Sequence, residues 1–220
     1  MRKLVLSTHV TLDGFASGPD GELDWHFSHW NDEMEEAVAE QLSTVDTILV
    51  GRVTYEAMAD YWPAAAADSG GRRKDIQFAE WMNRVAKIVF SRTLSPFDVE
   101  AMHWNNTRLI KGDIVEKIEA LKKERGRDMI IWGGVSIIQT FIKLGIVDEY
   151  NIWIAPVILG EGKPLFNDPA ALELELIRTK TFRSGVTLVC YRPKKQEQVT
   201  NSKTFAPGNN HCSYATNRIK

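Results

Sequence analysis

The sequence predicts an α/β fold in which helices flank a mostly parallel sheet, with antiparallel strands added at the C-terminal end. Two observations support this prediction. Apolar runs typical of buried strands alternate with helix-like segments through most of the chain, an order that favours parallel strands joined by crossover helices. From about residue 149 onward the chain is instead rich in strand-like segments separated by turn residues, which favours antiparallel pairing.

The individual elements follow from apolar periodicity and from the residues that begin or end each run. Asn31 is suited to cap a helix whose first turn is acidic, and Gly145 is suited to end one. Residues 63–74 are small, polar and glycine-containing, which favours a loop. The expected strands are residues 4–10, 47–50, 87–90, 107–110, 129–132, 149–155, 172–181 and 186–191. The expected helices are residues 32–43, 54–60, 75–83, 113–124 and 136–144.

Composition narrows the class of protein. The chain has 220 residues, of which 44% are hydrophobic and 25% charged, as is typical of a globular protein with one large domain. Its net charge of -2 gives no general attraction for nucleic acid or an anionic membrane, so phosphate has to be bound by individually placed groups. We therefore expect no nucleic-acid or membrane partner.

The chain also lacks the sequence signs of secretion. The apolar run at residues 4–6 is too short for a signal peptide, and no segment reaches the length of a membrane span. Cys190 and Cys212 match no zinc or redox spacing, and Cys190 lies in an apolar run typical of a buried thiol. These features predict a cytoplasmic protein. Residues 194–220 are polar without periodicity, and we expect a disordered tail or an added extension there.

Three predicted strands end in residues suited to a dinucleotide. Ligands of open α/β sheets bind at the carboxyl ends of the strands. Gly133-Gly134 lies at such an end, where missing side chains let the backbone approach a pyrophosphate. Val135 and Ser136 open the following helix, whose N-terminal N–H groups favour an anion. Taken by itself, a lone glycine pair is better explained by tight packing between a strand and a helix.

The other two strand ends carry arginines and hydroxyl groups. Gly51-Arg52 is followed by Thr54, and the guanidinium of Arg52 is a fixed fork of donors suited to phosphate. Ser91 and Arg92 are suited to the ribose 2′-phosphate that NADPH carries and NADH lacks. Taken singly, each pair also fits an ordinary exposed turn. Their shared position at strand ends is what predicts a dinucleotide site.

Other polar and aromatic residues are candidates for the substrate side. Asp13 precedes Gly14 and fits either a site residue or the cap of a turn. His26 and His29 have no third ligand at a regular spacing, so we predict no metal site. Glu56 is expected to pair with Arg52 rather than to act as a catalyst. The aromatic residues that fit either a dry site or core packing are Trp25, Phe27, Trp30, Tyr55 and Trp62.

Five ordered motifs extend this interpretation to about residue 192. They resemble the dihydrofolate-reductase superfamily, and most closely the reductase domain of riboflavin biosynthesis (the RibD C-terminal type) and its stand-alone bacterial relatives. The motifs are Thr11-Leu12-Asp13-Gly14-Phe15, residues 46–56, residues 87–94, Ile131-Trp132-Gly133-Gly134, and Asp148-Glu149-Tyr150 leading to residues 156–166. The resemblance implies a dihydrofolate-reductase-like three-layer fold for a domain of residues 1–193, followed by the tail at 194–220.

The resemblance also implies a function. It predicts NADPH as the cofactor and hydride transfer to a pyrimidine- or pterin-like molecule, most closely as in 5-amino-6-(5-phosphoribosylamino)uracil reductase. A dihydrofolate reductase and a non-catalytic NADPH-binding module are the alternatives, and a structural domain without a ligand is a third. By analogy with the family we expect a homodimer. The zinc-bearing deaminase domain normally fused to the riboflavin enzyme has no counterpart in the sequence.

Site residues are implied position by position. Asp13 and Glu36 are the candidate catalytic residues, although the resemblance does not distinguish Glu36 from Asp32, Glu33 or Glu35 on the same helix. The expected substrate-side residues are Trp25, Pro156 and Gly160. The expected cofactor-binding residues are Gly51, Arg52, Thr54, Ser91, Arg92, Gly133, Gly134, Val135 and Ser136.

Overall fold

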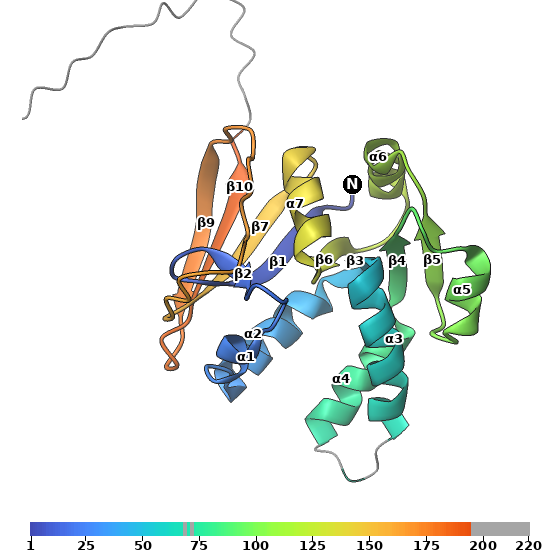
Figure 1. The fold of residues 1–220 in the computed structure, drawn as a ribbon, viewed down its shortest axis with the longest axis horizontal. Coiled ribbons are helices and arrows are strands. Elements are labelled where there is room, and N and C mark those ends of the chain that lie inside the picture. The colour runs from blue at the N-terminus through green and yellow to red at the C-terminus, as the bar shows by residue number, and fades with distance from the viewer. Residues whose placement is uncertain (68–69, 71–72, 195–220) are drawn as a thin grey trace, which may run out of the picture.

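A computed structural model describes residues 1–67, 70 and 73–194 (Figure 1). Its centre is an eight-stranded sheet with the order β5-β4-β3-β6-β1-β7-β10-β9. Neighbouring strands from β5 to β7 are parallel, whereas β10 is antiparallel to both β7 and β9. The strands are β1 Leu4–Thr11, β3 Val45–Gly51, β4 Ala86–Phe90, β5 Thr107–Ile110, β6 Asp128–Trp132, β7 Glu149–Ala155, β9 Leu174–Thr181 and β10 Thr187–Pro193. The predicted sheet is confirmed.

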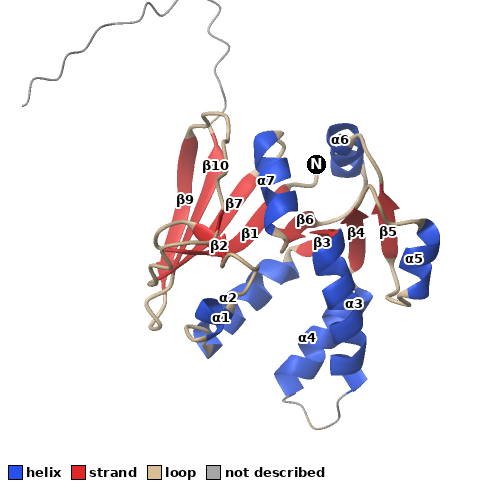
Figure 2. Ribbon diagram, viewed as in Figure 1, coloured by secondary structure: helices blue, strands red, loops and turns tan. Residues whose placement is uncertain are grey.

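Helices cover both faces of this sheet, which gives the expected three layers (Figure 2). Strand side chains alternate between the faces: Leu49 and Ile131 pack on one side, and Ile48 and Ile130 on the other. On the first face lie α6 (Ile114–Lys123) and α7 (Val135–Lys143). On the second lie α2 (Asp32–Ser43), α3 (Arg52–Ala67), α4 (Arg73–Arg84) and α5 (Pro96–Ala101).

One helix is longer than predicted. We expected a helix at 54–60 and a loop from residue 63, but α3 runs from Arg52 through Pro63 to Ala67. Four alanines after the proline have the highest helix propensity, which compensates for the hydrogen bond that proline removes. Trp62 on α3 also packs edge-on against Phe78 of α4, at 5.2 Å between ring centroids. Residues 68–69 and 71–72 of the predicted loop lie outside the described residues.

Four short elements had no counterpart in the prediction. They are α1 (Asp24–Phe27), α5, and a separate two-stranded pair of β2 (Phe15–Ser17) with β8 (Lys163–Pro164). Each is too short to leave a periodic apolar pattern. The β2–β8 pair matters for the site because it holds the turn after β1 against the segment after β7, where Leu165 N donates to Gly14 O at 2.9 Å. Of the predicted tail, all but Lys194 lies outside the described residues.

Candidate active site

The carboxyl ends of β3 and β6 meet at a cradle made of glycine backbone. Gly133 and Gly134, between β6 and α7, both have positive φ, at 78° and 82°. A Cβ on Gly133 would lie 3.0 Å from Thr54 Cγ2, and one on Gly134 would lie 3.0 Å from Thr54 Oγ1 and 3.9 Å from Gly51 N. Only glycine satisfies both the backbone conformation and the space. The structure thus brings together Gly51, Thr54, Gly133 and Gly134.

The cradle faces the first turn of α7. Gly134 is its N-cap, and Ile137 N and Ile138 N both donate to Gly134 O, at 3.2 and 3.1 Å. The N–H groups of the residues before them, which include Val135 and Ser136, have no partner within a helix and point outward at its positive end. Ser136 is exposed there. Free amides, small side chains and a helix N-terminus together form an arrangement suited to a pyrophosphate.

The predicted phosphate arginines lie at the neighbouring strand ends. Arg52 opens α3, and its guanidinium donates to both carboxylate oxygens of Glu56, at 3.1 and 3.0 Å, as expected for this pair. Arg92 is exposed after β4. Ser91 Oγ accepts from Thr93 N at 3.2 Å and from Leu94 N at 3.0 Å, so this hydroxyl shapes the turn that presents Arg92.

Asp13 joins two loops at the carboxyl end of β1. Its carboxylate accepts hydrogen bonds from Thr11 Oγ1 at 2.5 Å, from Leu159 N at 3.1 Å and from Gly160 N at 2.8 Å. The Thr11 hydroxyl and the Gly160 amide are the main causes that lower the pKa of Asp13. A carboxylate that is held ionised in this way positions loops rather than donates a proton.

A cluster of histidine and tryptophan rings lies beside this end of β1. His9 on β1 contacts His26 of α1, with ring centroids 3.9 Å apart, and stacks on Trp153 of β7 at 5.3 Å. Trp30 lies 5.9 Å from His9 and 5.3 Å from His26. Trp153 also stacks on Phe182 at 5.4 Å. We call His9, His26, Trp30, Trp153 and Phe182 the aromatic cluster.

Burial keeps the histidines of the aromatic cluster neutral. Desolvation lowers the pKa of His26 to about 4, and nearby His29 lowers it further. Desolvation, followed by the neighbouring His26, lowers the pKa of His9 well below its usual value. His26 Nε2 and Trp25 Nε1 are buried and have no hydrogen-bond partner among the described residues. No group of three His, Cys, Asp or Glu side chains in the described ranges is placed to hold a metal ion.

The acids of α2 point in different directions. Glu36, our candidate, is exposed, as is Asp32. Glu33 turns toward the C-terminal strands, where it accepts from Arg183 N at 3.0 Å. Glu35 is half-buried with one buried carboxylate oxygen. Val38 and Leu42 are core residues that follow Glu35 by three and seven positions, so all three share one side of the helix. Glu35 therefore lies at the edge of the face that packs on the sheet.

The other predicted residues are divided between the site and the core. Trp25 is half-buried on α1 beside His26, and Pro156 lies against the β9–β10 turn, 3.2 Å from where a Gly185 Cβ would be. Tyr55 is a core residue stacked on Trp104. Sequence reasoning missed His9, whose signal was a titratable residue inside an apolar strand. It also missed Trp132, which immediately precedes the glycine pair and lies 5.9 Å from Phe78 of α4.

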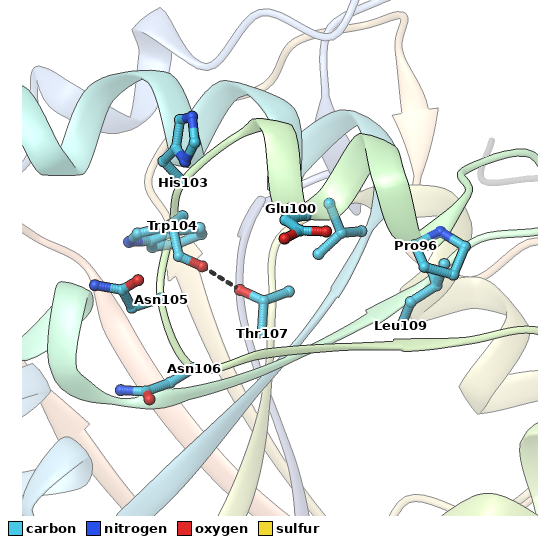
Figure 3. A pocket seen from close by; sticks show the side chains of 9 residues that line it. Pro96, Glu100, His103, Trp104, Asn105, Asn106, Thr107 and Leu109 are labelled. Carbon is cyan, nitrogen blue, oxygen red and sulfur yellow. Dashed lines mark hydrogen bonds between the residues drawn. The ribbon is translucent and has the colours of Figure 1, made fainter.

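A separate hollow lies away from these strand ends. A pocket of about 410 Å³ lies between α5 and the amino end of β5, where Thr107 Oγ1 donates to Trp104 O at 2.7 Å (Figure 3). Glu100 and Asn106 are among its polar walls. Because ligands of open α/β sheets bind at the opposite, carboxyl ends, this pocket is not the candidate active site.

Comparison with known proteins identifies the family of this chain. The model of the RibD C-terminal domain family matches residues 2–188. This chain belongs to that family. The uncharacterized protein YyaP of Bacillus subtilis (strain 168) is 37% identical over 193 residues, which cover 86% of this chain and 94% of YyaP. None of the helices within the described ranges is long and apolar enough to cross a membrane.

Solved structures extend the RibD-family match to the fold. The crystal structure of a candidate riboflavin biosynthesis protein from Shewanella sp. PV-4 has a TM-score of 0.67 at 26% identity, covering 89% of this chain and all of that one. A dihydrofolate reductase of Enterococcus faecalis, solved as a complex with NADP(H), has a TM-score of 0.55 at 14% identity over 87% of this chain and 96% of its own. The RibD-type chain therefore has the dihydrofolate-reductase-like fold that its motifs predicted.

Proposed function

We propose that this protein is an NADPH-dependent reductase of a pyrimidine- or pterin-like heterocycle. The observation that supports this most is the cradle at Gly133 and Gly134, where two glycines with positive φ pack tightly against Thr54 and lead into the N-terminus of α7 at the carboxyl end of β6. Membership of the RibD C-terminal family favours the reduction carried out by 5-amino-6-(5-phosphoribosylamino)uracil reductase. The NADP(H) complex of the enterococcal enzyme with the same fold supports the choice of cofactor.

Residues at different strand ends bind different parts of NADPH. Gly133, Gly134, Val135 and Ser136 bind the pyrophosphate through backbone amides, and Gly51 and Thr54 form the opposite wall. Arg52 and the pair Ser91-Arg92 face the adenosine 2′-phosphate side. When bound, the nicotinamide supplies the hydride. The task of the protein is to orient two rings and exclude water.

The substrate side is the end of β1 and β7. Asp13 holds the turn after β1 against Leu159 and Gly160, and this clamp fixes one wall of the site. The half-buried rings of Trp25, His26 and Trp30 provide flat surface for a heterocycle, and the buried Trp153 and Phe182 support them from below. Among the helix acids we propose Glu35 in place of Glu36 as the group that hydrogen-bonds the substrate, because Glu36 faces solvent.

The test is NADPH binding and turnover by the purified protein. We expect calorimetry to detect NADPH, with NADH bound at least tenfold more weakly, and Arg92→Ala to remove that preference. Loss of absorbance at the nicotinamide band with a panel of ribosylaminopyrimidines and dihydropterins would then identify the substrate class. Well-folded protein that gives no heat with NADPH contradicts the proposal. NADPH binding without turnover of any substrate favours a non-catalytic binding module.

A further inference from the structure

A second polar cavity lies at the opposite end of the sheet from the candidate active site. Its volume is about 300 Å³, at the lower end of the range for small-molecule sites. It lies between the last turns of α2, the amino halves of β1, β6 and β7, and Arg178 of β9. Its walls are Lys3, Val5, Glu40, Gln41, Thr44, Val45, Asp128, Glu149, Asn151 and Arg178. No part of the reductase proposal uses these residues.

Two side-chain amides in this cavity each carry a buried polar atom without a hydrogen-bond partner. Asn151 is 3% exposed, and its Oδ1 has no partner within the described part of the chain. Gln41 Oε1 accepts from Ser7 Oγ at 3.0 Å, whereas Gln41 Nε2 is buried and unpartnered. Buried polar groups in native structures are paired almost without exception, with protein or with a bound molecule, so these two amides mark where a molecule in the cavity would bond.

Strand register places these two amides next to each other. Ser7 of β1 lies directly opposite Asn151 of β7, and the side chains of paired residues point to the same face of the sheet. Ser7 is also the residue that bonds Gln41. One unpaired donor and one unpaired acceptor therefore lie side by side, which is the complement of a lactam edge, where a ring N–H stands beside a carbonyl.

The row of paired residues that contains Ser7 and Asn151 continues across the sheet to Arg178. Asn151 is opposite Cys190 of β10, and Cys190 is opposite Arg178 of β9. Lys3 and Glu149, also on the wall, pair with each other at 3.3 Å. The Arg178 side chain contacts the Cys190 thiol, and the ion pairs found among the described residues do not include it. The remaining donors of its guanidinium suit an anionic group at the end of the row.

We propose that this cavity binds a small planar ligand that carries a lactam edge and an anionic substituent. The lactam carbonyl accepts from Gln41 Nε2, the ring N–H donates to Asn151 Oδ1, and the anion pairs with Arg178. The site is separate from the proposed reductase site, because Ser7 precedes the carboxyl end of β1 at Thr11 by four residues, or roughly 13 Å of strand. It is therefore an additional binding site, whether or not the chain reduces a heterocycle.

The probes are orotate, which has a lactam and a carboxylate, uracil, which has the lactam alone, and benzoate, which has the carboxylate alone. Calorimetry on the full chain is expected to rank them orotate, uracil, benzoate. Asn151→Leu, close in shape to the native side chain, should weaken orotate binding at least tenfold. Arg178→Gln should make orotate and uracil equal. Arg183→Gln is the matched control, since it removes one exposed cation at the β9–β10 turn and should change nothing.

A pyrimidine probe is also able to enter the substrate side of the active site, so Trp25→Ala is assayed in parallel. Orotate binding that survives Trp25→Ala and falls with Arg178→Gln supports the cavity. Binding that is lost with Trp25→Ala and unchanged by Arg178→Gln overturns the proposal, as does the absence of orotate heat at millimolar concentration. A crystal soaked in orotate that shows only ordered water on Gln41 and Asn151 overturns it too. The Asn151→Leu result counts only if the circular dichroism spectrum of that variant matches the native protein. If the variant is misfolded, the test depends on Arg178→Gln, whose position is exposed.

Discussion

The two halves of the candidate active site present different kinds of groups, backbone in one and side chains in the other. At the ends of β3 and β6 the structure offers backbone: two glycines with positive φ, a helix N-terminus, and one threonine for a wall. At the ends of β1 and β7 it offers side chains, with His9 and Trp153 stacked in the aromatic cluster and Asp13 bridging two loops. The first half suits a cofactor whose phosphates are bound alike in many enzymes. The second half is where a particular substrate is distinguished.

The two halves should also differ in whether a substitution affects cofactor affinity or the stability of the fold. A backbone cradle depends on conformation at a few consecutive residues, so one added methyl group disturbs binding more than folding. The aromatic cluster joins α1, β1, β7 and the β9–β10 turn, so its rings hold the fold together as well as line the site. Substitutions in the two halves should therefore separate into effects on cofactor affinity and effects on stability.

The largest effect is expected in the side-chain half, at Trp153. This residue is 1% exposed, is stacked between His9 and Phe182, and donates from Nε1 to Ser7 Oγ at 3.1 Å. Trp153→Ala should lower the free energy of unfolding by about 3–5 kcal/mol, measured by urea denaturation. Trp25→Ala, at a half-buried position, should cost less than half of that. Equal costs at the two positions would mean that the aromatic cluster does not hold the fold together.

Acid should also destabilise this half first. His26 has a pKa of about 4 in the folded protein, against 6.5 for the free side chain, because burial disfavours its charge. The unfolded chain therefore binds more protons between these values, and stability that is complete above pH 6.5 is lost as the pH falls toward 4. For this partly exposed ring we expect a loss of about 2 kcal/mol.

His26→Phe is the variant that isolates this effect. Its unfolding free energy should change less between pH 6.5 and 4 than that of the native chain. Urea titrations at four pH values measure both slopes. Identical slopes for His26→Phe and the native chain would show that the His26 ring is solvated.

The same contrast explains which parts of the site could be predicted from the sequence alone. The Gly133-Gly134 cradle was predictable because the signal is local: a buried strand, two glycines and a helix start follow one another. The aromatic cluster was not, because His9, Trp153 and Phe182 come together only through strand order and register. Glu36 was named because periodicity cannot tell which side of α2 faces a ligand, and the structure leaves Glu35 with the buried oxygen.

The backbone half is tested by a pair of glycines. Gly134→Ala and Gly145→Ala both force alanine to a positive φ, at 82° and 65°, which costs about 1 kcal/mol of stability, and Gly134→Ala should cost more because its methyl group also meets Thr54 and Ile137. Only the first places its methyl group in the cradle, 3.0 Å from Thr54 Oγ1, whereas nothing lies within 4 Å of the second. Calorimetry should show NADPH affinity lowered at least tenfold by Gly134→Ala and unchanged by Gly145→Ala. The same loss in both variants would assign the effect to backbone strain alone.

The smallest expected effect concerns Arg52, a charged side chain in the half of the site that is otherwise made of backbone groups. Its side chain belongs to the cofactor half, yet in the structure it is held by Glu56 in an exposed pair that contributes at most about 0.5 kcal/mol. A phosphate has to displace that carboxylate or share the guanidinium with it. Glu56→Gln should therefore leave the urea midpoint almost unchanged and raise NADPH affinity by roughly twofold, with the gain shrinking as salt is added. Unchanged affinity at low ionic strength would mean that Arg52 points away from the phosphate, and the cofactor half would then depend on Arg92 and backbone amides.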